Sequence, residues 1–255
     1  AFVDWFYGSE NWPAFVGSSM ATLFVGSILF LTNKDNATEH LELRQAFLLT
    51  NSAWISIALF GSFPFLLSDI DMNFIDAFFE STSGITTTGA TVIENLEAKS
   101  HGILIWRALL QWLGGVGIIV MALAVLPMLS IGGMQLFKTE SYETPDKVVP
   151  KAASFAAGIS IVYITLTIIW AFMLWGAGMT IFDSVAHAMT TLATGGYSTK
   201  SESLAAFDSS TIEIIIIFGM LVGSLPFVHY LSLTKNGIKN LINDDQVKLF
   251  LTLVF

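Results

Sequence analysis

The chain has 255 residues and a formal net charge of −9, with 54% hydrophobic residues, 12% charged residues and no cysteine. Soluble domains carry about 25% charged residues, so this composition excludes an ordinary soluble domain and predicts an all-α membrane protein in contact with membrane lipid. The acidic balance argues against nucleic-acid binding, and the lack of cysteine excludes disulfides and thiolate metal sites.

Apolar runs long enough to cross a bilayer alternate with polar stretches. Residues 1–12 are aromatic and acidic, which suits a membrane interface, and this start looks cut from something longer. The predicted spans are, in chain order, 13–31, 46–67, 102–129, 152–175 and 212–233. Two other apolar runs, 73–85 and 180–192, have only about a dozen residues, so we expect them to be re-entrant.

The two short runs belong to a sequence motif that occurs twice in the chain. A shift of 107 residues places Asp76 on Asp183, and each short run then leads into a turn of threonine and glycine. Each copy therefore has the order span, short helix, turn and span, a duplication of the kind that builds many transport proteins. This order predicts an interfacial segment, one transmembrane helix and a cytoplasmic loop over 1–41, a first pore unit over 42–133, a second pore unit with cytoplasmic linkers over 134–245, and the start of a truncated third unit over 246–255.

Lysine and arginine predict the orientation. If 13–31 enters from outside, one side of the membrane receives Lys34, Arg44, Lys138, Lys147, Lys151, Lys235, Lys239 and Lys248. The other side receives only Lys99, Lys200 and, at a helix start, Arg107. We expect the first side to be cytoplasmic, with both turns in the outer half behind an acidic mouth that concentrates cations.

Both turns have the composition of a cation filter. A cation that enters a membrane must exchange its water shell for protein oxygens, and backbone carbonyls supply these without a fixed charge. Glycine allows the dihedrals that turn successive carbonyls the same way. The carboxyl ends of the short helices carry partial negative charge toward the cation, and we expect Asp76 and Asp183 to cap the opposite ends.

Three stretches, "DAFFESTSGITTTGATV", "WLGGVGIIVMALAVLPMLSIGGMQL" and "HAMTTLATGGYST", resemble the TrkH branch of the TrkH/KtrB/HKT superfamily of K⁺ transporters. The resemblance covers nearly the whole chain. It implies K⁺ uptake through a channel-like filter in a pore of four M1–P–M2 units (span, re-entrant pore helix, filter turn, span), two of which are present. The implied filter residues are Thr87, Thr88, Gly89, Ala90, Thr194, Gly195, Gly196 and Tyr197, with support from Thr86, Thr91, Ser198 and Arg107.

The same resemblance implies the ions and partners. Gly89 and Gly196 hold the filter-glycine positions, and K⁺, or Rb⁺ or Cs⁺ as surrogates, would meet carbonyls of Thr87, Thr88, Thr194 and Gly195. No covalent cofactor is implied. The implied setting is a bacterial inner membrane, with a homodimer and a cytoplasmic nucleotide-binding regulatory subunit of the TrkA type. The family's gating elements belong to the third and fourth units.

Two other classes of function stay open on the residues alone. A secondary transporter of another small solute, or a Na⁺-coupled K⁺ symporter, would need polar groups at mid-membrane depth. Gln111 and Ser160 are the best such groups, and neither is charged. A membrane-embedded enzyme would need a cluster of nucleophile, base or metal ligands, and the spans contain no such motif, so we expect no enzyme.

Three ionisable residues lie in or beside the apolar segments and need an interpretation. Arg107 either stabilises the filter and balances the acidic mouth or snorkels to the interface. His187 aligns with Glu80 and is expected to pack or to hydrogen-bond at the outer face rather than to bind a metal. His229 is expected to face the helix bundle.

Overall fold

The computed structural model describes residues 1–34, 43–129, 148–227, 229–231 and 244–254. Within those ranges every regular element is a helix, which agrees with the predicted fold class. Three helices are long and apolar enough to cross a membrane, over Trp12–Asn33, Phe47–Leu67 and Ala156–Gly176. The predicted cytoplasmic residues Lys138, Lys147, Lys235 and Lys239 lie outside the described residues.

The chain divides into two compact units, and each is described by itself. The first contains residues 1–115 and 195–209, and the second contains residues 116–194 and 210–255. The long helix α6 (His101–Leu129) begins in the first unit and continues into the second. The predicted boundaries after residues 41, 133 and 245 remain predictions.

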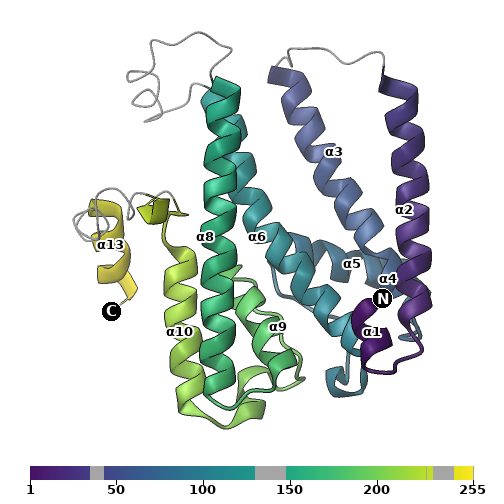
Figure 1. Ribbon diagram of the computed structural model, residues 1–255, viewed down its shortest axis with the longest axis vertical. Helices are drawn as coiled ribbons and strands as arrows, with labels where there is room; N and C mark the ends of the chain where they lie inside the picture. The colour runs from purple at the N-terminus through teal and green to yellow at the C-terminus, as the bar shows by residue number, and fades with distance from the viewer. Residues whose placement is uncertain (35–42, 130–147, 228, 232–243, 255) are drawn as a thin grey trace. The chain divides into compact units, whose positions relative to one another are not determined.

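The first unit combines long helices with several short ones (Figure 1). The elements are α1 (Phe2–Phe6), α2 (Trp12–Asn33), α3 (Leu43–Gly61), α4 (Phe63–Leu67), α5 (Phe74–Ile85), η2 (Leu96–Ala98), the start of α6 and η4 (Ser203–Phe207). Helix α2 packs on α1 and α4, and α5 packs on α3 and α4. Helix α2 begins with Pro13 in its first turn, where a missing N–H costs nothing.

The second predicted span agrees with the candidate span Phe47–Leu67, but its helix has a local break that the sequence analysis did not predict. Helix α3 ends at Gly61, and α4 begins at Phe63 after Ser62. The cause is Pro64, which has no N–H to donate and whose ring would clash with a helical carbonyl four residues earlier. At the break the Leu59 carbonyl stays hydrogen-bonded, because it accepts from the Ser62 hydroxyl at 2.7 Å and from the Ser62 N–H at 3.2 Å.

The two short helices begin in the same way, and the prediction about their caps was wrong in its detail. Asn73, not Asp76, caps α5, because its side chain accepts from the Asp76 N–H at 3.0 Å and donates to the Asp76 carboxylate at 2.6 Å. Thr180 caps α9 (Ile181–Leu192) by the same exchange with Asp183, at 3.1 and 2.8 Å. Each aspartate thus lies in the first turn of its helix, where its negative charge interacts favourably with the positive end of the helix dipole.

The second unit combines the short helix α9 with longer helices (Figure 1). Its elements are the end of α6, α8 (Val148–Gly176), α9, α10 (Ser210–Ser224) and α13 (Asp245–Val254). Helix α9 packs on α8 and α10. Within the predicted span 212–233 the helix α10 ends at Ser224, two residues before Pro226, and residues 228, 232 and 233 of that span lie outside the described residues.

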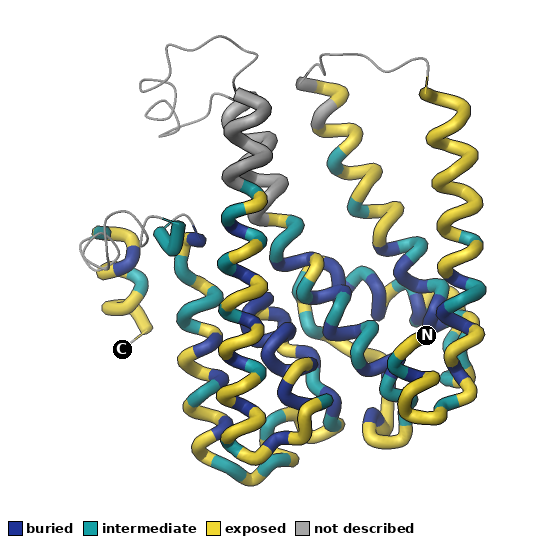
Figure 2. Tube along the Cα trace, viewed as in Figure 1, coloured by how far each residue is buried: buried dark blue, intermediate teal, exposed yellow. Residues whose placement is uncertain are grey.

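Much of the apolar surface lies outside the protein core (Figure 2). In the most apolar stretch of α2 only 11% of the residues are buried, and in that of α8 only 28%. Exposed side chains such as Leu23, Phe24, Phe30 and Phe172 would be costly in water, whereas lipid tails solvate them. The exposed apolar faces therefore support the membrane assignment.

Candidate functional site

The two predicted filter turns have the same backbone conformation. Thr87 has φ 55° and Gly89 has φ 80°, and the equivalent residues Thr194 and Gly196 have φ 52° and 81°. A β-branched threonine in the left-handed region is strained, by about 1–3 kcal/mol, and persists only where the surroundings impose it. Strain repeated at equivalent positions indicates that both turns are built for a particular carbonyl arrangement.

The first turn is anchored through its N–H groups. Thr87 donates to the Gly84 carbonyl at 3.0 Å, and Thr88 donates to the Ser83 carbonyl at 2.9 Å. Hydroxyls tighten the same region, since Thr86 donates to the Thr82 carbonyl at 2.7 Å and lies 2.8 Å from the Thr88 hydroxyl. Within the described part of the chain, no hydrogen bond reaches the carbonyls of Thr87, Thr88 or Gly89, so these oxygens are available to a cation.

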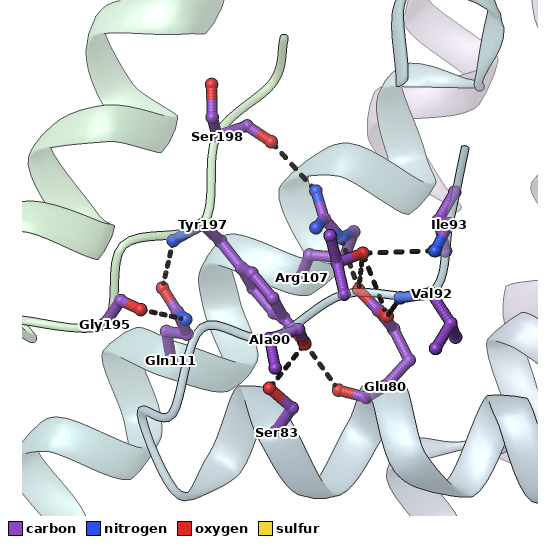
Figure 3. Close-up of polar contacts among 11 residues, drawn as sticks. Glu80, Ser83, Ala90, Val92, Ile93, Arg107, Gln111, Gly195, Tyr197 and Ser198 are labelled. Carbon is purple, nitrogen blue, oxygen red and sulfur yellow. Dashed lines mark hydrogen bonds and ion pairs between the residues drawn. The ribbon is translucent and has the colours of Figure 1, made fainter. Parts of the chain in front are cut away.

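The two turns touch at their glycines. A Cβ atom on Gly89 would overlap the Gly195 carbonyl oxygen, so no larger residue fits there without displacing the second turn. Gln111 of α6 is fully buried and lies close to both glycines. Figure 3 shows it beside Gly195. Its amide nitrogen donates to the Gly195 carbonyl at 2.8 Å, and its amide oxygen accepts from the Tyr197 N–H at 3.0 Å.

A buried ion pair braces both turns (Figure 3). Arg107 of α6 donates from Nε to Glu80 of α5 at 2.8 Å, and the two side chains are 1% and 0% exposed. Glu80 also accepts from the Thr91 hydroxyl at 2.9 Å and from the Val92 N–H at 3.0 Å. Arg107 also donates to the Ser198 carbonyl at 2.8 Å. These contacts contradict the snorkelling interpretation of Arg107.

Tyr197 joins the two turns through its side chain. Its ring centroid lies 4.1 Å from the guanidinium carbon of Arg107, a cation–π contact. Its hydroxyl lies 2.9 Å from the Glu80 carbonyl and 3.2 Å from the Ala90 carbonyl. The Ser83 hydroxyl also donates to the Ala90 carbonyl, at 2.6 Å. The Ala90 carbonyl and the Tyr197 side chain therefore hold the turns together.

The polar link after the first turn is tied to the segment after the second. Ser201 donates its N–H and its hydroxyl to the Glu97 carboxylate, at 2.8 and 2.6 Å, and its hydroxyl accepts from the Leu96 N–H at 3.1 Å. The side-chain and backbone hydrogen bonds from Ser201 lower the pKa of Glu97 to about 2. The first unit therefore holds residues 195–201 along their whole length.

The structure brings most of the predicted site residues together in the first unit. Thr86, Thr87, Thr88, Gly89, Ala90, Thr91, Arg107, Gly195, Gly196, Tyr197 and Ser198 all belong to it, while Thr194 belongs to the second unit. Sequence reasoning missed the roles of Glu80, Ser83 and Gln111. A signal existed, because Glu80 and Arg107 are isolated opposite charges in apolar segments, and Gln111 follows Arg107 by one helical turn on the same face.

The two histidines occupy structural positions. His187 is buried, and its Nδ1 lies 2.8 Å from the Asp183 carbonyl, as the hydrogen-bonding interpretation predicted. His229 lies 3.4 Å from the Asp244 carboxylate. Among the described residues no group of three or more histidine, aspartate or glutamate side chains could hold a metal ion.

Known proteins resemble this chain over almost its full length. Residues 12–255 match the model of the TrkH family, described as a cation transport protein. The Trk system potassium uptake protein TrkH of Escherichia coli K12 is 38% identical over 246 residues, which cover 95% of this chain and 51% of that relative. The Trk system potassium uptake protein TrkI of Halomonas elongata is 40% identical over 211 residues, which cover 82% of this chain and 43% of that relative.

A solved structure has the same fold. The crystal structure of the potassium transporter TrkH from Vibrio parahaemolyticus matches with a TM-score of 0.87 and 36% sequence identity, over 98% of this chain and 51% of that one. The chain thus spans about half the length of the relatives it matches.

Proposed function

Because the chain belongs to the TrkH family of cation transport proteins, we propose that it forms part of a K⁺ uptake pathway in a bacterial inner membrane. The chain spans about half of its relatives, so the pathway is a property of the longer protein. The supporting observation is the contact between Gly89 and Gly195, which sets two turns with matching strained backbones against each other. No enzymatic activity is proposed, since the family is one of transport proteins.

In this proposal backbone oxygens replace the water around the ion. Carbonyls of Thr87, Thr88 and Thr194 provide ligands. The Gly195 carbonyl, which the resemblance also implied as a ligand, is directed at the Gln111 amide, from which it accepts a hydrogen bond at 2.8 Å. The filter itself carries no fixed charge. Arg107 would repel a cation if it were alone, but the adjacent Glu80 carboxylate neutralises it.

The test is a substitution that pushes the two turns apart. In the full-length protein reconstituted in liposomes, Gly89→Ser places a side chain where the Gly195 carbonyl lies and where φ is 80°. We expect the ratio of Rb⁺ to Na⁺ flux to fall by at least about tenfold. Gly8→Ser is the matched control, because Gly8 has φ 70° and open space around its Cβ position. An unchanged flux ratio for Gly89→Ser in folded protein would contradict the proposal, as would a wild-type flux that ignores K⁺ and Rb⁺.

The setting of the pathway is part of the same proposal. The relatives' name, Trk system potassium uptake protein, supports a system with further components, for which we propose a homodimer and a TrkA-type nucleotide-binding subunit on the cytoplasmic side. The bias of lysine and arginine supports basic loops inside and filter turns outside. Labelling of a cysteine introduced at the exposed residue Glu202, from either side of sealed vesicles, tests the orientation.

A further inference from the structure

We infer that Gln111 is a specificity-determining positioning residue, because its amide fixes the direction of two successive peptide groups in the second turn. This role rests on the proposed function. The two groups are the peptide between Gly195 and Gly196, held by its oxygen at 2.8 Å, and the peptide between Gly196 and Tyr197, held by its N–H at 3.0 Å.

Because the peptide bond is planar, the hydrogen bond at the Tyr197 N–H also fixes the direction of the Gly196 carbonyl. In a trans peptide the N–H and the carbonyl point in opposite directions. The Tyr197 N–H points at Gln111, so the Gly196 carbonyl on the same peptide points away from Gln111 and from α6. No hydrogen bond reaches that carbonyl within the part of the chain that the structure describes. Gln111 therefore aims the Gly196 oxygen as an ion ligand.

The amide side chain is chemically specific for this task. A backbone N–H only donates and a backbone carbonyl only accepts, so one orientation of the amide satisfies both partners. The side chain is fully buried, and a Cβ atom on Gly195 would overlap its Cδ and Oε1 atoms. Glycine at 195 thus permits the close approach, and glutamine at 111 supplies one donor and one acceptor without a charge.

The variant Gln111→Glu distinguishes hydrogen bonding by this side chain from its packing alone. A neutral glutamic acid can still donate to Gly195 and accept from Tyr197, whereas an ionised carboxylate has only acceptors and faces the Gly195 carbonyl with negative charge. Varying the pH therefore compares two forms of the same side chain at one position. Gln111→Met keeps the volume and removes both hydrogen bonds at every pH.

The measurement is the ratio of Rb⁺ to Na⁺ flux in liposomes containing the full-length protein, between pH 5 and pH 8. We expect Gln111→Met to lower the ratio by about tenfold at both pH values, and Gln111→Glu to approach the wild-type ratio at pH 5 and to lose it at pH 8. Gln246→Glu, an exposed site on α13, is the matched control and keeps the wild-type ratio throughout. A Gln111→Glu variant that stays selective at every pH, beside an unselective Gln111→Met, also supports the role, since burial then keeps its carboxyl neutral.

Two results would overturn the inference while leaving K⁺ transport intact. One is a folded Gln111→Met variant with the wild-type flux ratio, and the other is a Gln111→Glu variant that is as unselective at pH 5 as at pH 8. A merely structural role would lower the yield of folded protein without changing the ratio. Wild-type protein that carries no Rb⁺ would overturn the proposed function itself, and this inference with it.

Discussion

The buried pair of Arg107 and Glu80 offers the sharpest test of how the turns are held. Arg107→Met removes the ion pair, the hydrogen bond to the Ser198 carbonyl and the cation–π contact with Tyr197 in one step. It leaves Glu80 fully buried, with hydrogen bonds from Thr91 and Val92 but no countercharge.

The size of the destabilisation expected for Arg107→Met follows from the burial of the ion pair. Removing one partner of a buried ion pair costs about 3–5 kcal/mol, because the remaining charge has lost the partner that offset its desolvation. We expect this loss in the free energy of unfolding for Arg107→Met. The double variant Arg107→Met/Glu80→Gln removes both charges, and we expect it to cost about 1–3 kcal/mol less than the sum of the two single variants.

The assay is denaturant unfolding of the full-length protein in detergent, followed by tryptophan fluorescence. Lys248→Met is the matched control, since Lys248 pairs with Asp245 at 3.4 Å but the two side chains are 54% and 99% exposed. We expect that control to change stability by about 1 kcal/mol or less. If Arg107→Met is no more destabilising than Lys248→Met, or if the single costs simply add, the buried pair is not what holds the turns.

Three further predictions concern other contacts. Asp4→Ala should lower the free energy of unfolding by about 1 kcal/mol, because the Asp4 carboxylate accepts from the Gly102 N–H at 2.6 Å in the first turn of α6; Asp4→Asn, which keeps an acceptor, should lose less. Glu97 has a pKa lowered from 4.5 to about 2, so its hydrogen bonds stabilise the folded state above pH 4.5, and this contribution is lost as pH falls toward 2. Denaturation curves across that range should show a smaller acid dependence for Glu97→Gln, and equal dependence would contradict the assignment. Gly219→Ala should lower the free energy of unfolding by about 1–3 kcal/mol, because a Cβ atom at this position of α10 would overlap the indole of Trp170. Gly26→Ala in α2, with open space at its Cβ position, is the control and should be neutral or stabilising in thermal unfolding.

Local patterns were sufficient to predict the repeated elements. The short helices start and end close to the predicted limits because run length and the threonine–glycine turns are readable along the chain. The errors have local causes too. Pro64 and Pro226 interrupt or follow helices inside runs that are apolar throughout, and hydropathy alone does not register such a break.

The hydrogen bonds that hold the second turn could not be predicted from local sequence patterns. The contacts of Gln111 and Arg107 reach residues 84 to 91 positions away, and no spacing rule connects them. Composition marked Gln111 and Arg107 as unusual inside apolar runs, but it could not identify their partners. Glu80 aligns with His187 in the repeat, and this alignment gave no indication that Glu80 forms an ion pair with Arg107.

The assignment of residues 195–209 to the first unit has a consequence for biosynthesis. When Arg107 and Gln111 leave the ribosome, the carbonyls and the N–H that they bind in the second turn have not yet been translated. Arg107 can pair with Glu80 at once, but the hydrogen bonds of Arg107 and Gln111 to residues 195–198 can form only after α8 and α9 have been synthesised. Such distant contacts form slowly. Amino-acid changes that leave the finished protein stable can therefore still reduce its yield by acting during this interval.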